Sequence, residues 1–374
     1  MAKKKTKCIG ILTAGGDCPG LNSAIRGVAK AAMHYGIKVI GIQDGFRGLV
    51  ENRFTSLDER AVSGILTLGG TILGSSRDKP HKMLMGDNIM DMTGVAVANA
   101  KEMQIDCLVC LGGNGTQKNA YKLSQAGLKI ITLPKTIDND VWGTDVSFGF
   151  DTALNIATDA IDRLHTTATS HHRAIVCEIM GHDAGWLALG AGIAGGADVI
   201  LIPEIPYNLN SVAEHLHNRR RQGKRFSIIA VAEGVRSVEE IEAAKEKPKN
   251  EKKKESENNL TNADGYALVQ EPTASRIARK LQQLTGIDAR VTSLGHVQRG
   301  GSPSATDRLL CTRLGTTVGE LLVASNYNVM VAVKGDTCKA VPLEEIAGKK
   351  KLVPENHHWI NCGKLVETCF GDTL

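Results

Sequence analysis

Short β-type runs of apolar residues alternate with longer helical stretches along most of this chain of 374 residues. The predicted strands are Cys8–Thr13, Val39–Ile42, Cys107–Leu111, Ile130–Leu133, Ala174–Met180, Val199–Pro203, Ser227–Ala232, Val291–Leu294 and Val329–Val333. The predicted helices are Ser23–Tyr35, Thr152–His165, Val212–Arg221, Ala274–Leu284 and Asp307–Ala324. Because this alternation is typical of parallel sheets covered by helices on both faces, it predicts an α/β fold with doubly wound, mostly parallel sheets. Ligands bind at the carboxyl ends of the strands in such folds, so the residues that follow each strand are the candidate functional residues.

The length of the chain, about two to three times that of a typical domain, predicts two packed lobes. We place the first lobe at residues 1–150, with the chain re-entering it near 290–325, and the second at 151–290; residues 326–374 form a C-terminal segment. Residues 243–262 lack apolar periodicity and contain six lysines and four glutamates. This composition predicts a solvated surface insertion, with an electrostatic docking arm as the alternative.

The composition argues against several classes of protein. With 42% hydrophobic and 23% charged residues, the chain can bury a core and is not disordered. A good part of the positive charge that gives a net +5 sits at residues 3–7 and 245–254, so we expect no nucleic-acid partner. Nine cysteines, an odd number in a long chain, indicate reduced thiols and a cytoplasmic protein. The most membrane-like stretch, residues 186–203, carries Asp198 and several glycines, so we expect no membrane segment.

Two glycine-rich loops follow predicted strands and lead into helices. The first contains Gly15, Gly16 and Asp17, and the second runs from Gly112 to Thr116. A helix N-terminus presents unpaired N–H groups that suit phosphate. Neither loop has the GxGxxG spacing of dinucleotide-binding proteins, and the first lacks the lysine of a P-loop. A Gly-Gly turn is purely structural about as often as it binds phosphate, but two such loops together predict a site for a polyanion.

The run Pro134-Lys135-Thr136-Ile137-Asp138-Asn139-Asp140 also follows a predicted strand. Two carboxylates beside a hydroxyl and an ammonium suit phosphoryl transfer, because one carboxylate can accept the proton of an attacking hydroxyl. The alternative is an Asx-rich turn in which Asp138 caps the following residues.

Further along the chain, basic residues suit a phosphorylated substrate, since arginine binds phosphate through a rigid fork. They are Arg173, His182, Arg290, His296 and Arg299. Each of them taken alone is more typical of a surface salt bridge. Glu233 follows a predicted strand and is an acceptor suited to sugar hydroxyls, or an exposed acid at a strand end.

Together these residues resemble the phosphofructokinase family, enzymes that phosphorylate the 1-hydroxyl of fructose 6-phosphate. The matching segments occur in family order and cover most of residues 8–310. They are GILTAGGDCPGLNSAIRG from Gly10, GGTILGSSR from Gly69, GGNGT, PKTIDND, FGFDTAL from Phe148, AIDRLHTTATSHHR from Ala160, EIMGHDAGWLAL from Glu178, AGGADVILIPE from Ala194 and LGHVQRGGSPSATDR from Leu294.

The resemblance implies a role for each matching position. The first lobe would bind the phosphoryl donor through Gly16, Arg77, Gly113, Asn114, Gly115 and Thr116. Asp138 would be the catalytic base, with Lys135, Thr136 and Asp140 beside it. The second lobe and the segment near residue 296 would bind the sugar phosphate, with Thr136, Ile137 and Asp138, through Met180, Gly181, His182, Glu233, His296, Val297, Gln298 and Arg299. Arg173 and Arg290 would reach across from a neighbouring subunit, which implies a homodimer or homotetramer.

The chain departs from the family pattern at several positions. Asn114 stands where an aspartate associated with Mg²⁺ is usual, and His182 replaces an arginine. An aspartate at the position of Gly115 accompanies pyrophosphate use, so Gly115 favours ATP as the donor. Lys135 instead resembles the pyrophosphate-using branch, although some ATP-using relatives also carry lysine. The resemblance therefore implies an ATP- and Mg²⁺-dependent 6-phosphofructokinase of glycolysis, in the mixed-substrate branch.

Other functions stay open at this point. One is a pyrophosphate-dependent transfer to the same sugar phosphate. Another is a catalytically weak regulatory subunit, which Asn114 suggests and which the presence of Arg77, Asp138 and Asp140 argues against. A dehydrogenase is disfavoured because the GxGxxG spacing is absent.

Overall fold

The computed structural model of the chain describes residues 6–246 and 271–372. The chain divides into two compact units: unit 1 contains Met1–Ala153 and His296–Lys351, and unit 2 contains Leu154–Gly295 and Leu352–Leu374. The expected insertion at residues 243–262 lies largely outside the described residues, but its first four residues end helix α8 (Val238–Glu246) instead of belonging to a loop. The C-terminal segment is shared between the two units.

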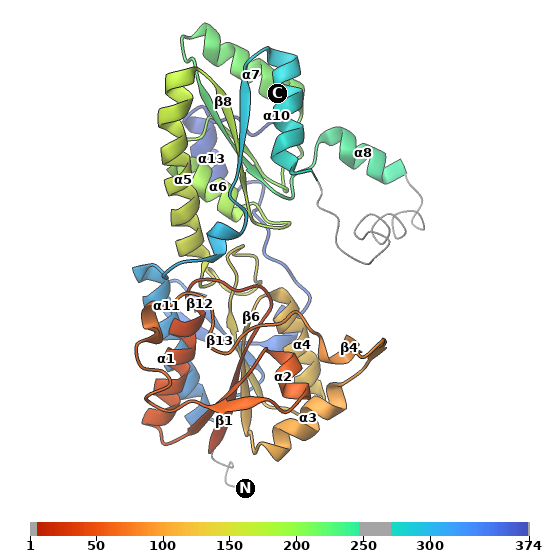
Figure 1. Cartoon of the computed structure of the whole chain (residues 1–374), viewed down its shortest axis with the longest axis vertical. Coiled ribbons are helices and arrows are strands. Elements are labelled where there is room, and N and C mark those ends of the chain that lie inside the picture. Colours follow the sequence, from red (N-terminus) through yellow and green to blue (C-terminus); the bar gives the residue numbers. More distant parts are fainter. Residues whose placement is uncertain (1–5, 247–270, 373–374) are drawn as a thin grey trace. The chain divides into compact units, whose positions relative to one another are not determined.

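Unit 1 is built on a seven-stranded sheet in the order β13-β12-β7-β6-β1-β2-β3 (Figure 1). Its strands are β1 (Cys8–Ala14), β2 (Lys38–Ile42), β3 (Phe54–Ser56), β6 (Cys107–Gly112), β7 (Ile130–Pro134), β12 (Val329–Lys334) and β13 (Thr337–Pro342). The strands from β12 to β2 are parallel, and β3 and β13 pair antiparallel at the two edges. The strand order reverses at the β1–β6 pair, so the glycine loops after β1 and β6 flank the switch point where ligands bind in such sheets.

Helices cover both faces of this sheet. Helix α1 (Leu21–His34) packs against α11 (Ala305–Val323) on one face. On the other face lie α2 (Phe46–Val50), α3 (Thr93–Glu102), α4 (Asn114–Gln125) and α12 (Leu343–Ile346), whose buried side chains share one apolar core with alternate residues of the strands. The short 3₁₀ helices η1 (Ile65–Thr67) and η2 (Pro80–Lys82) lie in the chain between β3 and α3.

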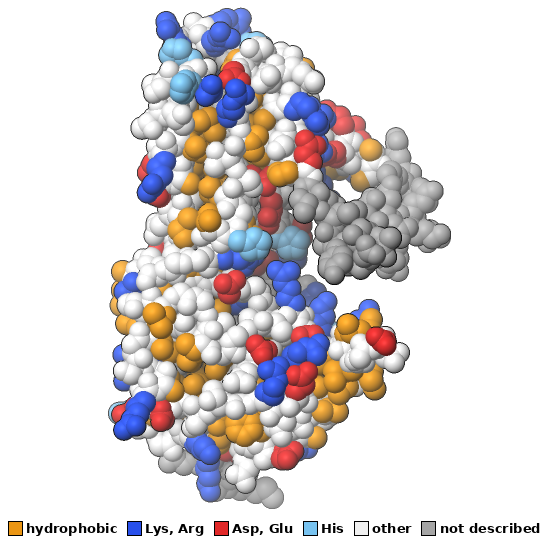
Figure 2. Space-filling model, in the orientation of Figure 1, with side chains coloured by type: hydrophobic (Ala, Val, Ile, Leu, Met, Phe, Trp, Pro, Cys, Tyr) orange, Lys and Arg blue, Asp and Glu red, His pale blue; other side chains and the backbone are white. Residues whose placement is uncertain are grey.

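A two-stranded hairpin, β4 (Met83–Met85) and β5 (Asn88–Met90), stands apart from the main sheet of unit 1. The sequence pattern did not predict it. Figure 2 shows apolar side chains gathered over this hairpin, where Leu84, Ile89 and Met90 are exposed.

Glycines set the distance between α1 and α11. A Cβ atom on Gly315 would lie 2.4 Å from the backbone carbon of Gly27, and one on Gly27 would lie 2.9 Å from the carbonyl oxygen of Cys311. The two helix backbones are therefore in direct contact. Since α1 begins directly after the first glycine loop, this contact also fixes the position of that loop.

Gly315→Ala is expected to lower the free energy of unfolding by about 1–3 kcal/mol, because the backbone of α1 must move away from the added methyl group. Chemical denaturation followed by circular dichroism measures the change. Gly94→Ala is the matched control: Gly94 lies in α3, and no other described element lies within 4 Å of the position of a Cβ there, so this variant is expected to be neutral or slightly more stable. Equal effects of the two substitutions would contradict the close contact.

Unit 2 contains a four-stranded sheet in the order β11-β8-β10-β9, and all of its pairs are parallel. Its strands are β8 (Ala174–Ile179), β9 (Val199–Leu201), β10 (Ser227–Ala232) and β11 (Ala289–Ser293). Helices α7 (Leu209–Arg221) and α10 (Thr273–Thr285) pack together on one face, and α6 (Trp186–Ala194) with α13 (His358–Leu365) and most of α5 (Phe150–His171) on the other (Figure 1). The two mostly parallel sheets confirm the predicted α/β fold class.

Candidate functional site

The first glycine loop runs beside a second segment of unit 1. Gly15, which follows β1 and has φ 85°, donates its N–H to the carbonyl of Ser76 at 2.8 Å. The Ser75 hydroxyl donates to the carbonyl of Gly15 at 2.6 Å. These bonds place Arg77 next to the predicted phosphate loop.

The second glycine loop leads into α4, which begins after Gly113 without a side-chain cap. The backbone N–H groups of the first turn of α4 are therefore available to bind an anionic ligand. Apart from the backbone of α4 itself and the adjoining residues, no atom of the described part of the chain lies within 4 Å of the position that a Cβ on Gly115 would take. The Thr116 hydroxyl donates to the carbonyl of Ala14 at 3.4 Å, which ties this loop to the end of β1.

A cavity of about 200 Å³ in unit 1 lies between these segments. Its lining contains Arg77, Gly115 and Thr116, three of the residues predicted to bind the donor. The full set is Ala14, Gly15, Phe46, Ser76, Arg77, Asp78, Lys79, Gly115, Thr116 and Asn119. Asp78 pairs with Arg47 at 2.9 Å, and this hydrogen-bonded pair lowers the pKa of Asp78. A neighbouring hollow, lined in part by Gly16, Asp17 and Arg77, continues along the first glycine loop.

The loop after β7 presents one carboxylate to solvent. In residues 131–141, every residue is buried except Asp138, which is half-buried. The Thr136 hydroxyl donates to Asp138 Oδ2 at 3.2 Å, and the Asp138 N–H donates to Thr136 Oγ1 at 3.1 Å. Asp138 is therefore the side chain of residues 131–141 that can reach a bound molecule. Its backbone N–H is held by an ST-turn with the Thr136 hydroxyl.

Two cations converge on the first glycine loop. The Lys135 ammonium, which is buried, donates to the carbonyl of Gly16. Arg299, on the 3₁₀ helix η3 (Gly295–Arg299), donates to the carbonyl of Asp17 at 3.1 Å. Burial lowers the pKa of Lys135, and the charge of Arg299 acts in the same direction. Unit 1 thus brings Gly16, Lys135 and Arg299 together.

The half-buried Asn114 pairs with the buried Asp140. The amide of Asn114 donates to Asp140 Oδ2 at 2.7 Å and to the Asp140 carbonyl at 3.2 Å. Asn114 Oδ1 is buried, and it has no hydrogen-bond partner among the residues that the structure describes. Burial, helped by the charge of Asp138, raises the pKa of Asp140 to about 6.

Asp140→Asn is expected to stabilise the protein at neutral pH. The unfolded chain ionises Asp140 near its ordinary pKa of 3.8, whereas the folded chain keeps the proton until about pH 6. The buried charge therefore costs stability as the pH rises through this window, on the order of 1–3 kcal/mol once the window is passed. Denaturation in EDTA should show the variant more stable at pH 7.5, with a gain that shrinks towards pH 4. A gain independent of pH would contradict the assignment.

In unit 2, four predicted residues lie together at the carboxyl ends of β8 and β10. The Glu233 carboxylate accepts the N–H of His182 at 2.7 Å and that of Gly181 at 3.4 Å. The Glu233 N–H donates to the carbonyl of Ile179 at 3.0 Å. Met180 and Gly181 directly follow β8, and His182 has φ 53° and an exposed side chain. The structure thus brings Met180, Gly181, His182 and Glu233 together after the strands, and their role as ligand groups stays a prediction.

The structure separates Arg173 and Arg290 from that group. Both lie at the amino-terminal end of the second sheet, Arg173 just before β8 and Arg290 near the start of β11. Both pair with Asp288, at 2.7 Å and 2.5 Å. Within one chain they are therefore at the opposite end of the sheet from Gly181 and Glu233, and their predicted role across a subunit boundary stays a prediction.

Three further predicted residues, His296, Val297 and Gln298, lie in the 3₁₀ helix η3. Gln298 is buried, whereas His296 is exposed and Val297 is 65% exposed. Ile137 lies in the loop after β7 and is fully buried, backbone included.

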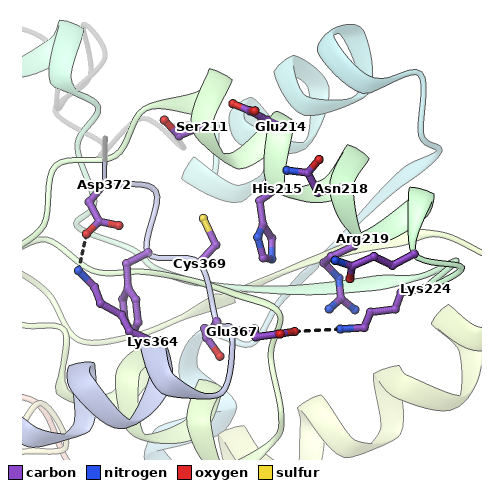
Figure 3. A pocket seen from close by; sticks show the side chains of 13 residues that line it. Ser211, Glu214, His215, Asn218, Arg219, Lys224, Lys364, Glu367, Cys369 and Asp372 are labelled. Atoms are coloured by element: carbon purple, nitrogen blue, oxygen red, sulfur yellow. Dashed lines mark hydrogen bonds and ion pairs between the residues drawn. The ribbon is translucent and has the colours of Figure 1, made fainter. Parts of the chain in front are cut away.

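Unit 2 has a further cavity of about 500 Å³ that contains none of the predicted site residues (Figure 3). It lies between α7 and residues 364–372. Lys224 pairs with Glu367 at 3.3 Å, and Lys364 pairs with Asp372 at 2.5 Å. Burial lowers the pKa of His215 at the cavity wall.

The sequence pattern does not mark two charged residues near the predicted catalytic loop, the buried Asp307 and the half-buried Lys351. Asp307 accepts the N–H of Gly149 and the N–H of Thr152, each at 2.9 Å, and so anchors the start of α5. Lys351 lies against the loop after β7. Asp307 lies within a matching segment, but nothing in the sequence pattern shows where either side chain packs.

Comparison with known proteins identifies the family. A family model described as Phosphofructokinase matches residues 8–322. The ATP-dependent 6-phosphofructokinase of Propionibacterium freudenreichii subsp. shermanii is 54% identical over 371 residues, covering 97% of this chain and 99% of the relative. That of Spirochaeta thermophila is 52% identical over 377 residues, covering 100% of both chains.

Solved structures of phosphofructokinases also match the fold of this chain. Pichia pastoris phosphofructokinase in the T-state matches with a TM-score of 0.77 at 30% identity, over 92% of this chain and 36% of that one. A pyrophosphate-dependent phosphofructokinase from Nitrosospira multiformis matches with a TM-score of 0.78 at 20% identity, over 98% and 93% of the two chains, and shows the fold alone.

The parallel sheet, with glycine loops, cations and a carboxylate following its strands, belongs to the α/β class, in which ligands bind at the carboxyl edge of the sheet. The chain belongs to the phosphofructokinase family, which confirms the resemblance seen in the sequence. In the described residues 6–246 and 271–372, the structure contains no helix of the length and apolarity needed to cross a membrane.

Proposed function

We propose that this chain is a phosphotransferase that moves the γ-phosphoryl group of ATP to the 1-hydroxyl of fructose 6-phosphate, giving fructose 1,6-bisphosphate and ADP. The observation that carries the proposal is the accessible carboxylate of Asp138 in the unit where the two glycine loops, Lys135 and Arg299 meet. The names of relatives that match the whole chain support it.

The reaction needs a base and charge neutralisation. The Asp138 carboxylate would take the proton of the sugar hydroxyl as its oxygen bonds to the γ-phosphorus, and the bond from that phosphorus to the β-phosphate oxygen breaks. The charges of Lys135 and Arg299 would offset the charge of the transferring group. Catalysis of this kind is mostly positioning, which suits a loop whose residues are buried apart from Asp138.

ATP as the donor is supported by the open space at Gly115. A donor with an α-phosphate needs room near the start of α4, and no side chain fills it. The cavity beside Arg77 and Thr116 would hold the rest of the donor. Relatives at 44–54% identity over the whole chain carry ATP dependence in their names.

Among its described residues, unit 1 offers Mg²⁺ one candidate oxygen ligand near the proposed donor site. The described residues hold no group of three or more His, Cys, Asp or Glu that could bind a metal ion. The buried Asn114 Oδ1 is an oxygen ligand without another partner among these residues, and Mg²⁺ binds oxygen while keeping waters and substrate phosphates. Asn114 would thus contribute one oxygen. When bound, the ion would neutralise charge on the donor phosphates.

The sugar phosphate would be bound by Met180, Gly181, His182 and Glu233, with His296 and Arg299. Arg173 and Arg290 would act from a neighbouring subunit in a homodimer or homotetramer. We place the enzyme in glycolysis, in the cytoplasm.

Assays with fructose 6-phosphate and either ATP or pyrophosphate, each with Mg²⁺, test the proposal. Formation of fructose 1,6-bisphosphate with ATP is expected. Turnover with pyrophosphate alone would overturn the choice of donor. Calorimetric binding of both ATP and fructose 6-phosphate without product from either donor would instead identify a regulatory subunit.

A further inference from the structure

The C-terminal segment contributes to the predicted catalytic loop although the family model ends at residue 322. In unit 1, residues 349–351 run antiparallel to the end of that loop, with an isolated bridge between Val141 and Lys350. The N–H of Lys351 donates to the carbonyl of Asp140 at 2.8 Å. No residue of this segment was predicted to act in the site.

The side chain of Lys351 binds the same loop at three further points. Its ammonium group donates to Asn139 Oδ1 at 2.9 Å, to the carbonyl of Asp145 at 2.8 Å and to the carbonyl of Thr144 at 3.2 Å. The acceptors in these three bonds are neutral oxygens of the loop, so the bonds hold the loop backbone and the Asn139 side chain in place.

Asn139 is the residue between the two carboxylates. It has φ 52° and is buried, and its Oδ1 also accepts the N–H of Ser147 at 3.1 Å. A left-handed residue reverses the direction of the chain, so the orientation of Asn139 sets the directions of Asp138 and Asp140.

The far end of the loop, residues 144 and 145, is bound to strand β12 by hydrogen bonds that do not involve Lys351. The N–H of Val333 donates to the Thr144 hydroxyl at 2.9 Å, and the N–H of Asp145 donates to the carbonyl of Val333 at 3.0 Å. Because β12 fixes residues 144 and 145, the ammonium of Lys351 links Asn139 to a rigid support.

We infer that Lys351 is a positioning residue for phosphoryl transfer, which holds Asn139 and thereby the carboxylate of Asp138 in the geometry needed to accept the hydroxyl proton. The inference rests on the proposed function. Loss of the ammonium leaves two backbone carbonyls without this donor and Asn139 Oδ1 with one donor instead of two. The turn at Asn139 can then move by up to about 1 Å, which is enough to slow a reaction that depends on the alignment of Asp138 with the hydroxyl.

Lys351→Met is expected to lower kcat by about 10- to 100-fold while KM for ATP and for fructose 6-phosphate changes less than about threefold. Methionine keeps the length of the apolar stem and removes the charge. Lys349→Met is the matched control, because Lys349 is exposed on the same segment and its ammonium lies 6.0 Å from the centroid of the Trp142 ring, away from Asn139. This control is expected to keep wild-type kcat and KM.

Asn139→Gly provides a second, independent test. Glycine adopts positive φ without strain, so this variant should fold while lacking the Oδ1 that Lys351 binds. We expect a similar fall in kcat, and no further fall when Lys351→Met is added, since both changes remove the same contact. If Lys351→Met fails to fold, as judged by near-ultraviolet circular dichroism, the kcat of the Asn139→Gly enzyme tests the inference instead.

Three outcomes would overturn the inference. They are a folded Lys351→Met enzyme with kcat within twofold of wild type, an Asn139→Gly enzyme with normal kcat, or effects of the two substitutions that multiply. Wild-type enzyme measured in parallel separates the two proposals: absence of turnover in the wild type refutes the proposed function, whereas unchanged kcat in the variants of an active enzyme refutes the role of Lys351.

Discussion

Asp138→Asn is expected to lower kcat for fructose 6-phosphate phosphorylation by about 10²–10⁴-fold while the KM values for both substrates stay close to wild type. The amide has nearly the shape of the carboxylate, and its oxygen can still accept the Thr136 hydroxyl that lies 3.2 Å from Asp138 Oδ2. It cannot take the proton of the attacking hydroxyl. The loss should therefore fall on the transition state and not on binding.

Steady-state kinetics with a coupled detection of ADP measures kcat, and calorimetry with fructose 6-phosphate measures binding. Asp145→Asn is the control: this aspartate lies in the same stretch of chain but is half exposed and pairs with Lys334 at 3.1 Å. Its removal should change kcat only a few-fold. Normal turnover by the Asp138→Asn enzyme would show that another group, or water, accepts the proton.

The fold could be predicted from the sequence where burial is continuous. The strands β1, β6, β7 and β10 are buried at every residue, and their runs of valine, isoleucine and leucine mark them clearly. The edge strand β13 was missed because its six residues, TCKAVP, are exposed or half-exposed and partly polar. Its pairing with β12 comes from the hairpin that joins them and not from an apolar pattern.

The site could be predicted to the extent that its residues follow strands. Gly16, Gly113, Asp138 and Gly181 all come directly after a parallel strand or a few residues on, so the sheet itself brings each of them to a carboxyl edge. Lys351 could not be predicted in this way. It is 212 residues from Asn139 in the sequence, and it is the last of three consecutive lysines, Lys349 to Lys351, a run that carries no periodic signal.

The two ends of the second sheet show a related limit. Residue type alone groups Arg173 and Arg290 with the other basic residues, because arginine suits phosphate. Within one chain their positions at the beginning of β8 and β11 place them at the amino-terminal edge, so the predicted role in the site requires a neighbouring subunit. A residue type indicates the chemistry, whereas its position relative to the strand decides which edge of the sheet it reaches.

Gly115→Asp is expected to reduce kcat/KM for ATP by about 10²–10³-fold. Two negative charges about 4 Å apart repel by roughly 4 kcal/mol at an effective dielectric constant of about 20, and a carboxylate here would face the α-phosphate of the proposed donor. The fold should tolerate the change, since among the described residues no other element lies within 4 Å of a Cβ at this position and an acidic residue suits the first turn of α4. The thermal midpoint should therefore stay near that of the wild type.

Gly115→Asn separates charge from size, because asparagine fills the same space without the negative charge. If repulsion excludes ATP, the asparagine enzyme should retain much more ATP-dependent activity than the aspartate enzyme, and the aspartate enzyme should use pyrophosphate, which has no α-phosphate, at least as well as wild type. Equal losses with both substitutions would mean that space, not charge, limits the donor. Undiminished use of ATP by the Gly115→Asp enzyme would mean that ATP does not pass the start of α4, and the donor would then have to bind elsewhere than in the cavity beside Arg77.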